Sequence, residues 1–392
     1  MTSLLDLPPE LLLRVFQQLG ESNSDKERQR DLQRLAPVCK AFHATAVPLL
    51  YGDTVNVRSA GRTFLLSRTL AARPDLAVLV HSLAAHSTFD QGHGPSTVAV
   101  LRDTPNLVSL ELGEPLLQRL GTPAARAALA AKRLTRFSYG FGAGATSLTE
   151  LAPFLQGWNS LERLELHNVL IVRDSLDRLR SELERTTPAP EDPPLHSAPT
   201  YALRGVAVHF ETSLQPLPTP PVWSLAAFNW VLGSTNALSS LVLVHTTSGV
   251  GLPALFDALV ERGCGPTLRR LTIRRFTHVD VQKGLAPPHA VDPSALVQWF
   301  PSLSHLALEE TPSAPNVLHP TPAFVPPPEL RVLELHGDEL HRGFQLARTL
   351  EAGGGALGKI RLVGPSPTSA EIKLLRWACE EKGVLLEVAR AL

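Results

Sequence analysis

The stretch LERLEL at residues 161–166 decides how most of the chain is interpreted. Its leucines occupy the first, fourth and sixth places, so in an extended chain the last two point to one side and the residues beside them to the other. The same apolar spacing occurs in ten units, which begin at residues 80, 107, 134, 161, 203, 238, 268, 303, 330 and 357. Five are strict leucine triplets, against about two expected by chance, and a spacing of 27 residues recurs at both ends of the series. The chain is therefore predicted to contain a repeated short strand.

Segments with helical spacing lie between these strands, at 147–155, 173–184, 253–262, 293–300 and 340–350. The last unit has a capping box formed by Thr368 and Glu371, an apolar helical face, Gly383 as its end and a returning strand over 384–388. One strand and one helix cannot bury their apolar faces alone, so successive units are expected to stack into a solenoid with a parallel sheet.

From about residue 78 to the end, this pattern resembles leucine-rich-repeat proteins. It departs from their consensus at the Asn or Cys position, which Val169 and Phe276 occupy, so irregular repeats are expected. Pro-rich inserts account for the longer spacings, near 186–200, 215–221 and 311–328. Because proline lacks an N–H and disfavours helix before it, these inserts are predicted to be extended loops, with a role as ligands for Pro-binding domains as the alternative.

The first twenty residues have the features of a capped helix. Pro8 and Pro9 suit a first helical turn, and Glu10 suits the positive end of the helix dipole. A wide apolar stripe follows at Leu11, Leu12, Val15, Phe16 and Leu19. Gly20 is placed to end the helix.

The next thirty residues extend this helical module. The polar run 21–31 is predicted to be a loop, and a second helical pattern over 32–50 is broken by Pro37 and ends near Pro48. A module of fifty residues buries too little to enclose all of this apolar surface, so part of it is expected to face a partner. The alternative is a hairpin packed wholly against the rest of the chain.

These residues resemble the F-box family, through Leu7-Pro8, Glu10, Leu11-Leu12, Val15, Leu19, Leu35, Val38-Cys39-Lys40, Phe42 and the exit Pro48-Leu49-Leu50-Tyr51 found in fungal members. The similarity covers about residues 4–51. It departs in the long charged run 21–31 and at Phe42, where the family often has Trp, so a less tightly docked third helix is expected. The resemblance implies that a Skp adaptor is bound by Leu7, Pro8, Leu11, Val15, Leu19, Leu35, Val38 and Cys39.

The fold class expected from both parts is α/β, with a small all-α F-box-like module over 1–52 and an irregular leucine-rich-repeat solenoid over 53–392. The residues between the leucines should alternate onto the open face of the sheet. Eight of them are predicted to bind a target protein: Glu111, Arg136, Arg163, Glu165, Arg270, His305, Glu334 and Arg361. Both charge signs are mixed with small residues, which suits a protein partner.

Composition limits the possible partners. The 392 residues carry 37 Lys+Arg and 37 Asp+Glu, so no broad basic surface is available for nucleic acid or anionic lipid. The three cysteines are far apart and odd in number, which fits neither a disulfide framework nor a paired metal knuckle. Without a secretory leader or an apolar run long enough to cross a bilayer, the chain is expected in the cytoplasm, the nucleus or both.

Motifs for chemistry are few. Residues 140–145 read G-x-G-x-x-A between a predicted strand and helix, with Glu165 twenty residues further on, as in dinucleotide-binding folds. A turn between repeats can use the same small residues. No His pair has the spacing of a metal motif, and no nucleophile elbow or P-loop occurs, so no cofactor, no metal and no catalytic residue is predicted.

The two resemblances together imply a non-catalytic receptor subunit of a Skp–cullin–F-box ubiquitin ligase. The helical module would bind the Skp adaptor and through it cullin, while the repeats hold an unidentified target protein near the ubiquitin-charged subunit. Two alternatives stay open. One is a repeat scaffold with an adaptor-only role outside ubiquitination, and the other is a nucleotide-dependent enzyme built around residues 140–145.

Overall fold

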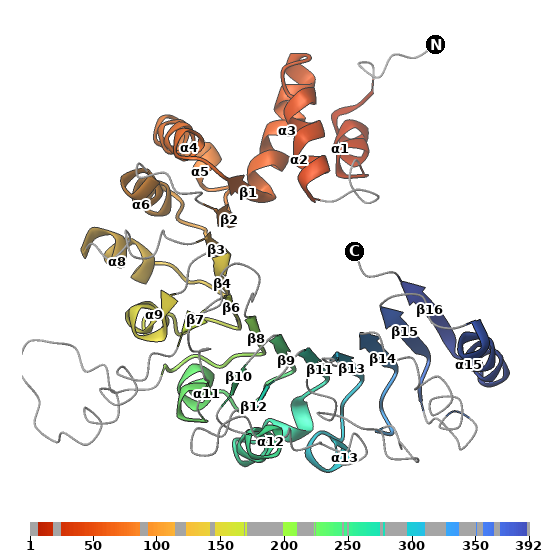
Figure 1. The fold of residues 1–392 in the computed structure, drawn as a ribbon. Coiled ribbons are helices and arrows are strands. Elements are labelled where there is room, and N and C mark those ends of the chain that lie inside the picture. Colours follow the sequence, from red (N-terminus) through yellow and green to blue (C-terminus); the bar gives the residue numbers. More distant parts are fainter. Residues whose placement is uncertain are drawn as a thin grey trace, which may run out of the picture. The chain divides into compact units, whose positions relative to one another are not determined.

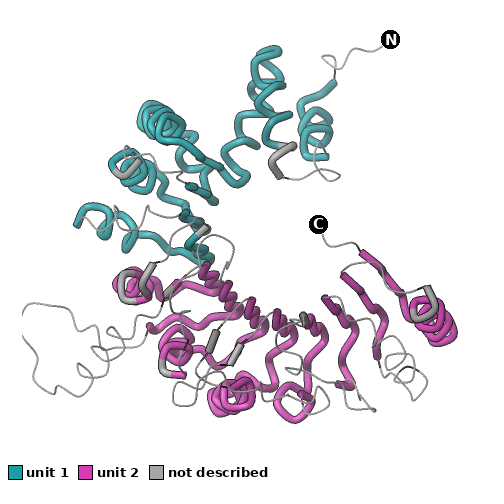
Figure 2. The backbone as a smooth tube through the Cα atoms, viewed as in Figure 1, with its two compact units in different colours: residues 1–144 teal, residues 145–392 magenta. Residues whose placement is uncertain are grey.

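The computed structural model describes the chain in two compact units, residues 1–144 and 145–392 (Figure 2). The described residues are 7–18, 25–86, 93–113, 123–141, 146–167, 169–170, 199–209, 223, 225–244, 247–248, 251–274, 277–278, 296–309, 327–336, 350, 356–363 and 369–389. The predicted domain boundary at residue 52 remains a prediction, because the first unit contains both the N-terminal helices and the first strands.

The first unit begins with three helices, α1 (Pro9–Gln18), α2 (Asp25–Leu35) and α3 (Lys40–Gly52). Helix α3 packs against both α1 and α2 (Figure 1). As expected, α1 starts at the proline pair, and the Pro8 carbonyl accepts the N–H groups of Leu11 and Leu12 at 3.0 and 3.1 Å. The first helical turn is thus built from the residues that predicted it.

Two predictions for this module were wrong. The run 21–31 was expected to be a loop, but residues from Asp25 onward are helical, because Lys, Glu, Arg and Gln favour helix and Leu32 anchors α2 in the core with 0% exposure. Helix α3 was expected to end near Pro48, yet it continues to Gly52. The N–H of Asp53 closes the last turn by donating to the Leu49 carbonyl at 3.0 Å.

The rest of the first unit alternates strands with helices: β1 (Thr54–Val57), α4 (Ala60–Ala72), α5 (Pro74–Ala77), β2 (Ser82–Ala85), α6 (His93–Asp103), β3 (Ser109–Gly113), α8 (Pro123–Ala130) and β4 (Arg136–Phe141). The strands pair in parallel in the order β1, β2, β3, β4, and α4 packs on α6, which packs on α8. Strand β1 was not predicted, because its sequence TVNV lacks the repeated leucine spacing.

The second unit contains eight parallel strands in chain order: β6 (Arg163–His167), β8 (Gly205–His209), β9 (Ser240–Val244), β11 (Arg270–Arg274), β13 (His305–Glu309), β14 (Val332–His336), β15 (Lys359–Val363) and β16 (Leu385–Ala389). Its described helices are α9 (Leu148–Leu155), α11 (Leu225–Leu232), α12 (Leu252–Glu261), α13 (Leu296–Trp299) and α15 (Ser369–Lys382). Helices α11, α12 and α13 lie along one face of this sheet (Figure 1). Two short pairs, β5 (Thr146–Ser147) with β7 (Val169–Leu170) and β10 (Thr247–Ser248) with β12 (Thr277–His278), complete the unit.

All ten predicted strands are present, and so is the returning strand at β16. Most of the leucines that defined the pattern are buried, as Leu164 and Leu166 are in β6, although Leu335 in β14 is only partly buried. The residues between them lie on the opposite face. Gly383, with φ +68°, ends α15 as expected. The predicted helix over 173–184, most of that over 340–350, Thr368 and nearly all of the Pro-rich inserts lie outside the described residues.

Side chains of several types join neighbouring repeats by hydrogen bonds to backbone carbonyls. Asn106 Nδ2 donates to the Val78 carbonyl at 2.8 Å, and the buried Lys132 Nζ donates to the Thr104 carbonyl at 2.6 Å. Burial lowers the pKa of Lys132, since it disfavours the charged amine. In the second unit a threonine hydroxyl serves this purpose, as Thr267 Oγ1 donates to Leu238 at 3.0 Å.

The position of Gly140, the first glycine of the G-x-G-x-x-A motif, is explained by the backbone of β4. Leu112 pairs with Tyr139 and Gly113 with Phe141, so Gly140 is one extra residue in β4, and its φ is +100°. A bulge in this conformation favours glycine. Residues 142–145 lie outside the described part of the chain. None of the described helices is long and apolar enough to cross a membrane.

Candidate functional site

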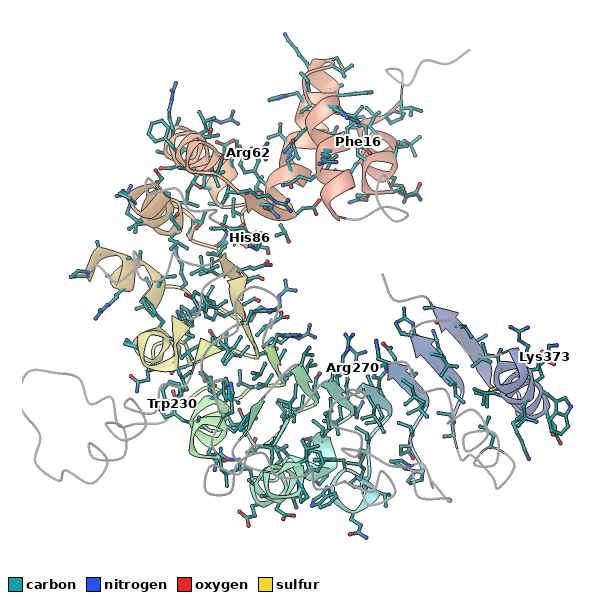
Figure 3. The ribbon with its side chains drawn as sticks, in the orientation of Figure 1. Phe16, Arg62, His86, Trp230, Arg270 and Lys373 are labelled. Atoms are coloured by element: carbon teal, nitrogen blue, oxygen red, sulfur yellow. The ribbon has the colours of Figure 1, made fainter. Side chains whose placement is uncertain are left out.

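The N-terminal helices share an apolar core. Leu12, Phe16, Leu32, Phe42 and Ala46 are each at most 5% exposed. The rings of Phe16 and Phe42 meet edge to face with centroids 5.2 Å apart, and Phe16 lies among the three helices (Figure 3). Phe42 therefore helps to hold the third helix against the first, and docking less tight than with Trp stays a prediction.

Apolar side chains remain outside this core. Leu11 is 44% exposed, Leu13 38% and Val38 60%. Of the predicted adaptor-binding residues, Pro8, Leu11 and Val38 are exposed, and Leu7, Val15, Leu35 and Cys39 are partly buried against the core. Leu19 lies outside the described residues. We name Pro8, Leu11, Leu13 and Val38 the exposed helix set.

Cys39 has a structural role as well. It is the N-cap of α3, and its Sγ accepts a hydrogen bond from the Phe42 N–H at 3.4 Å. A capping side chain satisfies one of the four N–H groups that begin a helix without an internal partner. The half-buried position of Cys39 follows from this cap.

The predicted target-binding residues all lie on strand positions that alternate with the buried leucines. In the first unit these are Glu111 and Arg136; Glu111 forms an ion pair with His86 at 2.9 Å. In the second unit they are Arg163, Glu165, Arg270, His305, Glu334 and Arg361. Arg270 lies on the side of the sheet away from α12 and α13 (Figure 3). The structure does not gather the eight at one point; they follow the open faces of the strands.

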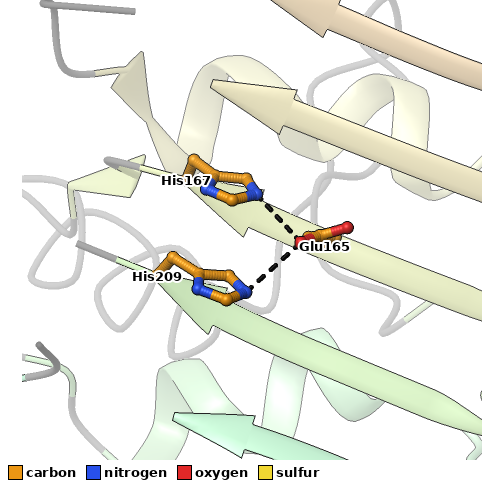
Figure 4. Close-up of side chains that lie close together, drawn as sticks. All are labelled: Glu165, His167 and His209. Atoms are coloured by element: carbon orange, nitrogen blue, oxygen red, sulfur yellow. Dashed lines mark hydrogen bonds and ion pairs between the residues drawn. The ribbon is translucent and has the colours of Figure 1, made fainter. Parts of the chain in front are cut away.

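Glu165 is part of a three-residue cluster on β6 and β8 (Figure 4). Its Oε1 lies 3.0 Å from Nε2 of His167 and 3.3 Å from Nε2 of His209. The two imidazole rings are stacked, with centroids 4.4 Å apart and planes 6° apart, because the register pairs His167 directly with His209. Hydrogen bonds from His167 and His209 hold the pKa of the Glu165 carboxyl well below its usual range. Within the described part of the chain, this is the one group of three side chains able to share a metal ion.

A second acidic position, Glu334 on β14, has different neighbours. It contacts His336 on the same strand, and Arg361 on β15 lies 3.5 Å from its Oε2. Burial raises the pKa of the Glu334 carboxyl, but the hydrogen bond from His336 and the positive charges of His336 and Arg361 outweigh it, so the pKa is lowered. Arg361 also reaches Glu387 on β16 at 3.8 Å, so the positions form a charged network across three strands.

His305 on β13 stands beside this network. Burial lowers the pKa of His305, and the charge of Arg270 lowers it further. A neutral imidazole in a mixed-charge surface supplies both a donor and an acceptor.

Sequence reasoning missed His167 and His209 because spacing rules for metal motifs look for ligands close together in the chain. A different pattern contains the information. Histidine stands six places after the first apolar residue in four of the ten repeats, at His86, His167, His209 and His336. Of these four, only His167 and His209 belong to successive repeats. Parallel strands paired in equal register bring residues at the same place of successive repeats side by side.

No protein-family model and no curated protein matches the chain. Among solved structures, it resembles a chain of the crystal structure of the Rad7 and Elc1 complex in yeast. The sequence identity is 14%, the TM-score is 0.31, and the match covers 84% of this chain and 88% of that chain.

Proposed function

We propose that the chain is the receptor subunit of a Skp–cullin–F-box ubiquitin ligase, without catalytic residues of its own. Helices α1–α3 bind the Skp adaptor through the exposed helix set, and the open faces of the strands hold a target protein. The cytoplasm and the nucleus are the compartments in which such an assembly works.

One observation carries the proposal. The three helices share a buried core, and Leu11 and Val38 are 44% and 60% exposed at positions that match the F-box pattern. Scattered single apolar residues are normal on a protein surface, but several on one small module favour a protein interface. The alternative of a hairpin packed wholly against its own chain does not account for them.

The open strand faces support the second half of the proposal. They mix Arg, Glu, His and small residues, which suits the polar rim of a protein interface better than a polyanion site. Only a few of these residues are expected to dominate the affinity for a target.

The test is co-purification with a Skp adaptor. In the full-length chain, Leu11→Asp and Val38→Asp should each reduce recovered adaptor at least about tenfold, because a carboxylate would be buried in an apolar interface. Leu65→Asp on α4 is the matched control, since Leu65 is 58% exposed but lies outside the three helices. Adaptor binding that survives both helix variants, or is lost equally in the control, overturns the proposal.

The same purification separates the alternatives. Cullin in the assembly supports the ligase role, while adaptor without cullin supports the adaptor-only scaffold. A nucleotide-dependent enzyme would instead show a thermal shift with a dinucleotide at saturating concentration.

A further inference from the structure

We propose that Glu165, His167 and His209 form a binding site for one divalent transition-metal ion of the zinc class. The proposal does not depend on the ligase role. It rests on three side chains from two neighbouring strands whose donor atoms all lie within 4.8 Å of one another.

The distances suit a shared ion. Ligand atoms bound at about 2.0 Å in a tetrahedron are about 3.3 Å apart. The Glu165 oxygen lies 3.0 Å and 3.3 Å from the two Nε2 atoms. Because a ring nitrogen binds a metal in the plane of its ring, the two nearly parallel imidazoles would tilt toward each other for all three atoms to contact one ion.

The donor types select the ion. Two imidazole nitrogens with one carboxylate oxygen suit zinc and its neighbours, whereas Mg²⁺ and Ca²⁺ prefer oxygen donors alone. Binding requires an unprotonated Nε2 on each ring.

The surroundings also favour a site. The side chain of His167 is 9% exposed and that of His209 is 24% exposed, and both imidazoles are carried by directly paired strand positions. Glu165 is 42% exposed and leaves one side of the cluster open to solvent. Three protein ligands with an open fourth position would let water or a side chain of a bound protein complete the coordination.

The test is isothermal titration of the tag-free, full-length chain with ZnCl₂, and with MgCl₂ for comparison. We expect saturable binding near one Zn²⁺ per chain at this site and none with Mg²⁺. His209→Ala and Glu165→Gln should each weaken it at least about 100-fold, more than the loss typical of an outer-shell change. Co²⁺ loading should add a visible absorption band that both variants lack.

His336→Ala is the matched control, because His336 also follows a Leu-Glu-Leu stretch and contacts Glu334 on the same strand. It should leave the site's affinity for Zn²⁺ unchanged. His209→Ala is the decisive variant, since the more exposed ring is the less disruptive to remove. Absence of the 1:1 binding in the native chain overturns the proposal, and so does equal affinity in His209→Ala and His336→Ala.

Discussion

Strands β6 and β14 both contain Leu-Glu-Leu-His, at residues 164–167 and 333–336, yet their surroundings differ. In β6 the next strand places Ala207 opposite Glu165 and His209 opposite His167. In β14 it places Arg361 opposite Glu334 and Val363 opposite His336. The Glu-His pair of β6 is therefore joined by the His209 imidazole, and the pair of β14 by the Arg361 guanidinium. The chemistry of a repeat surface therefore depends on pairs of strands more than on one strand.

The largest expected effect comes from exchanging these neighbours. Arg361→Ala with Val363→His would copy the β8 arrangement onto β15, and the zinc stoichiometry should rise by one. Ala207→Arg with His209→Val should abolish binding at β6, since a fixed cation repels the ion and one ligand is lost. Metal content after dialysis measures both, and folding is checked by circular dichroism. If the zinc content stays constant in both exchanges, the neighbouring strand does not decide whether a Glu-His pair binds zinc.

Next in size is the effect of the buried leucines. Leu166 is 0% exposed and Leu335 is only partly buried at the matching place. Leu166→Ala should lower the free energy of unfolding by about 3 kcal/mol and Leu335→Ala by about 1 kcal/mol, because the cavity is smaller where the side chain is less enclosed. Urea denaturation gives both values, and equal losses would contradict the difference in burial.

A smaller effect is expected from acid at β14. The folded chain lowers the pKa of Glu334, so its ionised form adds stability above the unfolded value of about 4.3, and this is lost as the pH falls through the folded value. Glu334→Gln should cost about 1 kcal/mol at pH 7, and this cost should shrink as the pH falls through the folded pKa. Thermal unfolding measured from pH 7 into acid tests the direction of this pH dependence. A destabilisation by Glu334→Gln that grew as the pH fell would contradict the prediction.

The smallest effects are expected from two solvent-exposed ion pairs, one beside β6 and β8 and the other on β15 and β16. Arg204 and Glu162 are 3.9 Å apart and 71% and 48% exposed, and Lys359 and Glu387 are 2.8 Å apart and 33% and 43% exposed. Arg204→Ala and Lys359→Ala should each change stability by less than about 1 kcal/mol, and added salt should reduce the second change. A large, salt-independent loss in either variant would assign that side chain a packing role.

The parallel sheet could be predicted because its evidence is repeated. Apolar residues two apart recur on one face of every repeated strand, so chance matches at single sites matter little. Strand β1 lacked that spacing, and α2 was hidden because a highly charged run gave no apolar stripe, although one buried leucine was enough to anchor it.

The two candidate sites differ in what could be predicted from sequence. Leu11 and Val38 stand within a contiguous pattern, whereas Glu165 and His209 are 44 residues apart and become neighbours only through strand register. Register depends on how long each connection is and where each strand begins, and neither is visible in a local motif.

In the long sheet of the second unit, the strands from β6 to β16 follow one another in chain order, with the short strands β7, β10 and β12 pairing outside it. Contacts in such an array are close in sequence, so its contact order is low and each new repeat can dock on the one already made. During synthesis, the β6–β8 pair can form on the ribosome long before β16 is translated. Unfolding should accordingly proceed by the separation of one repeat from its neighbour at a time.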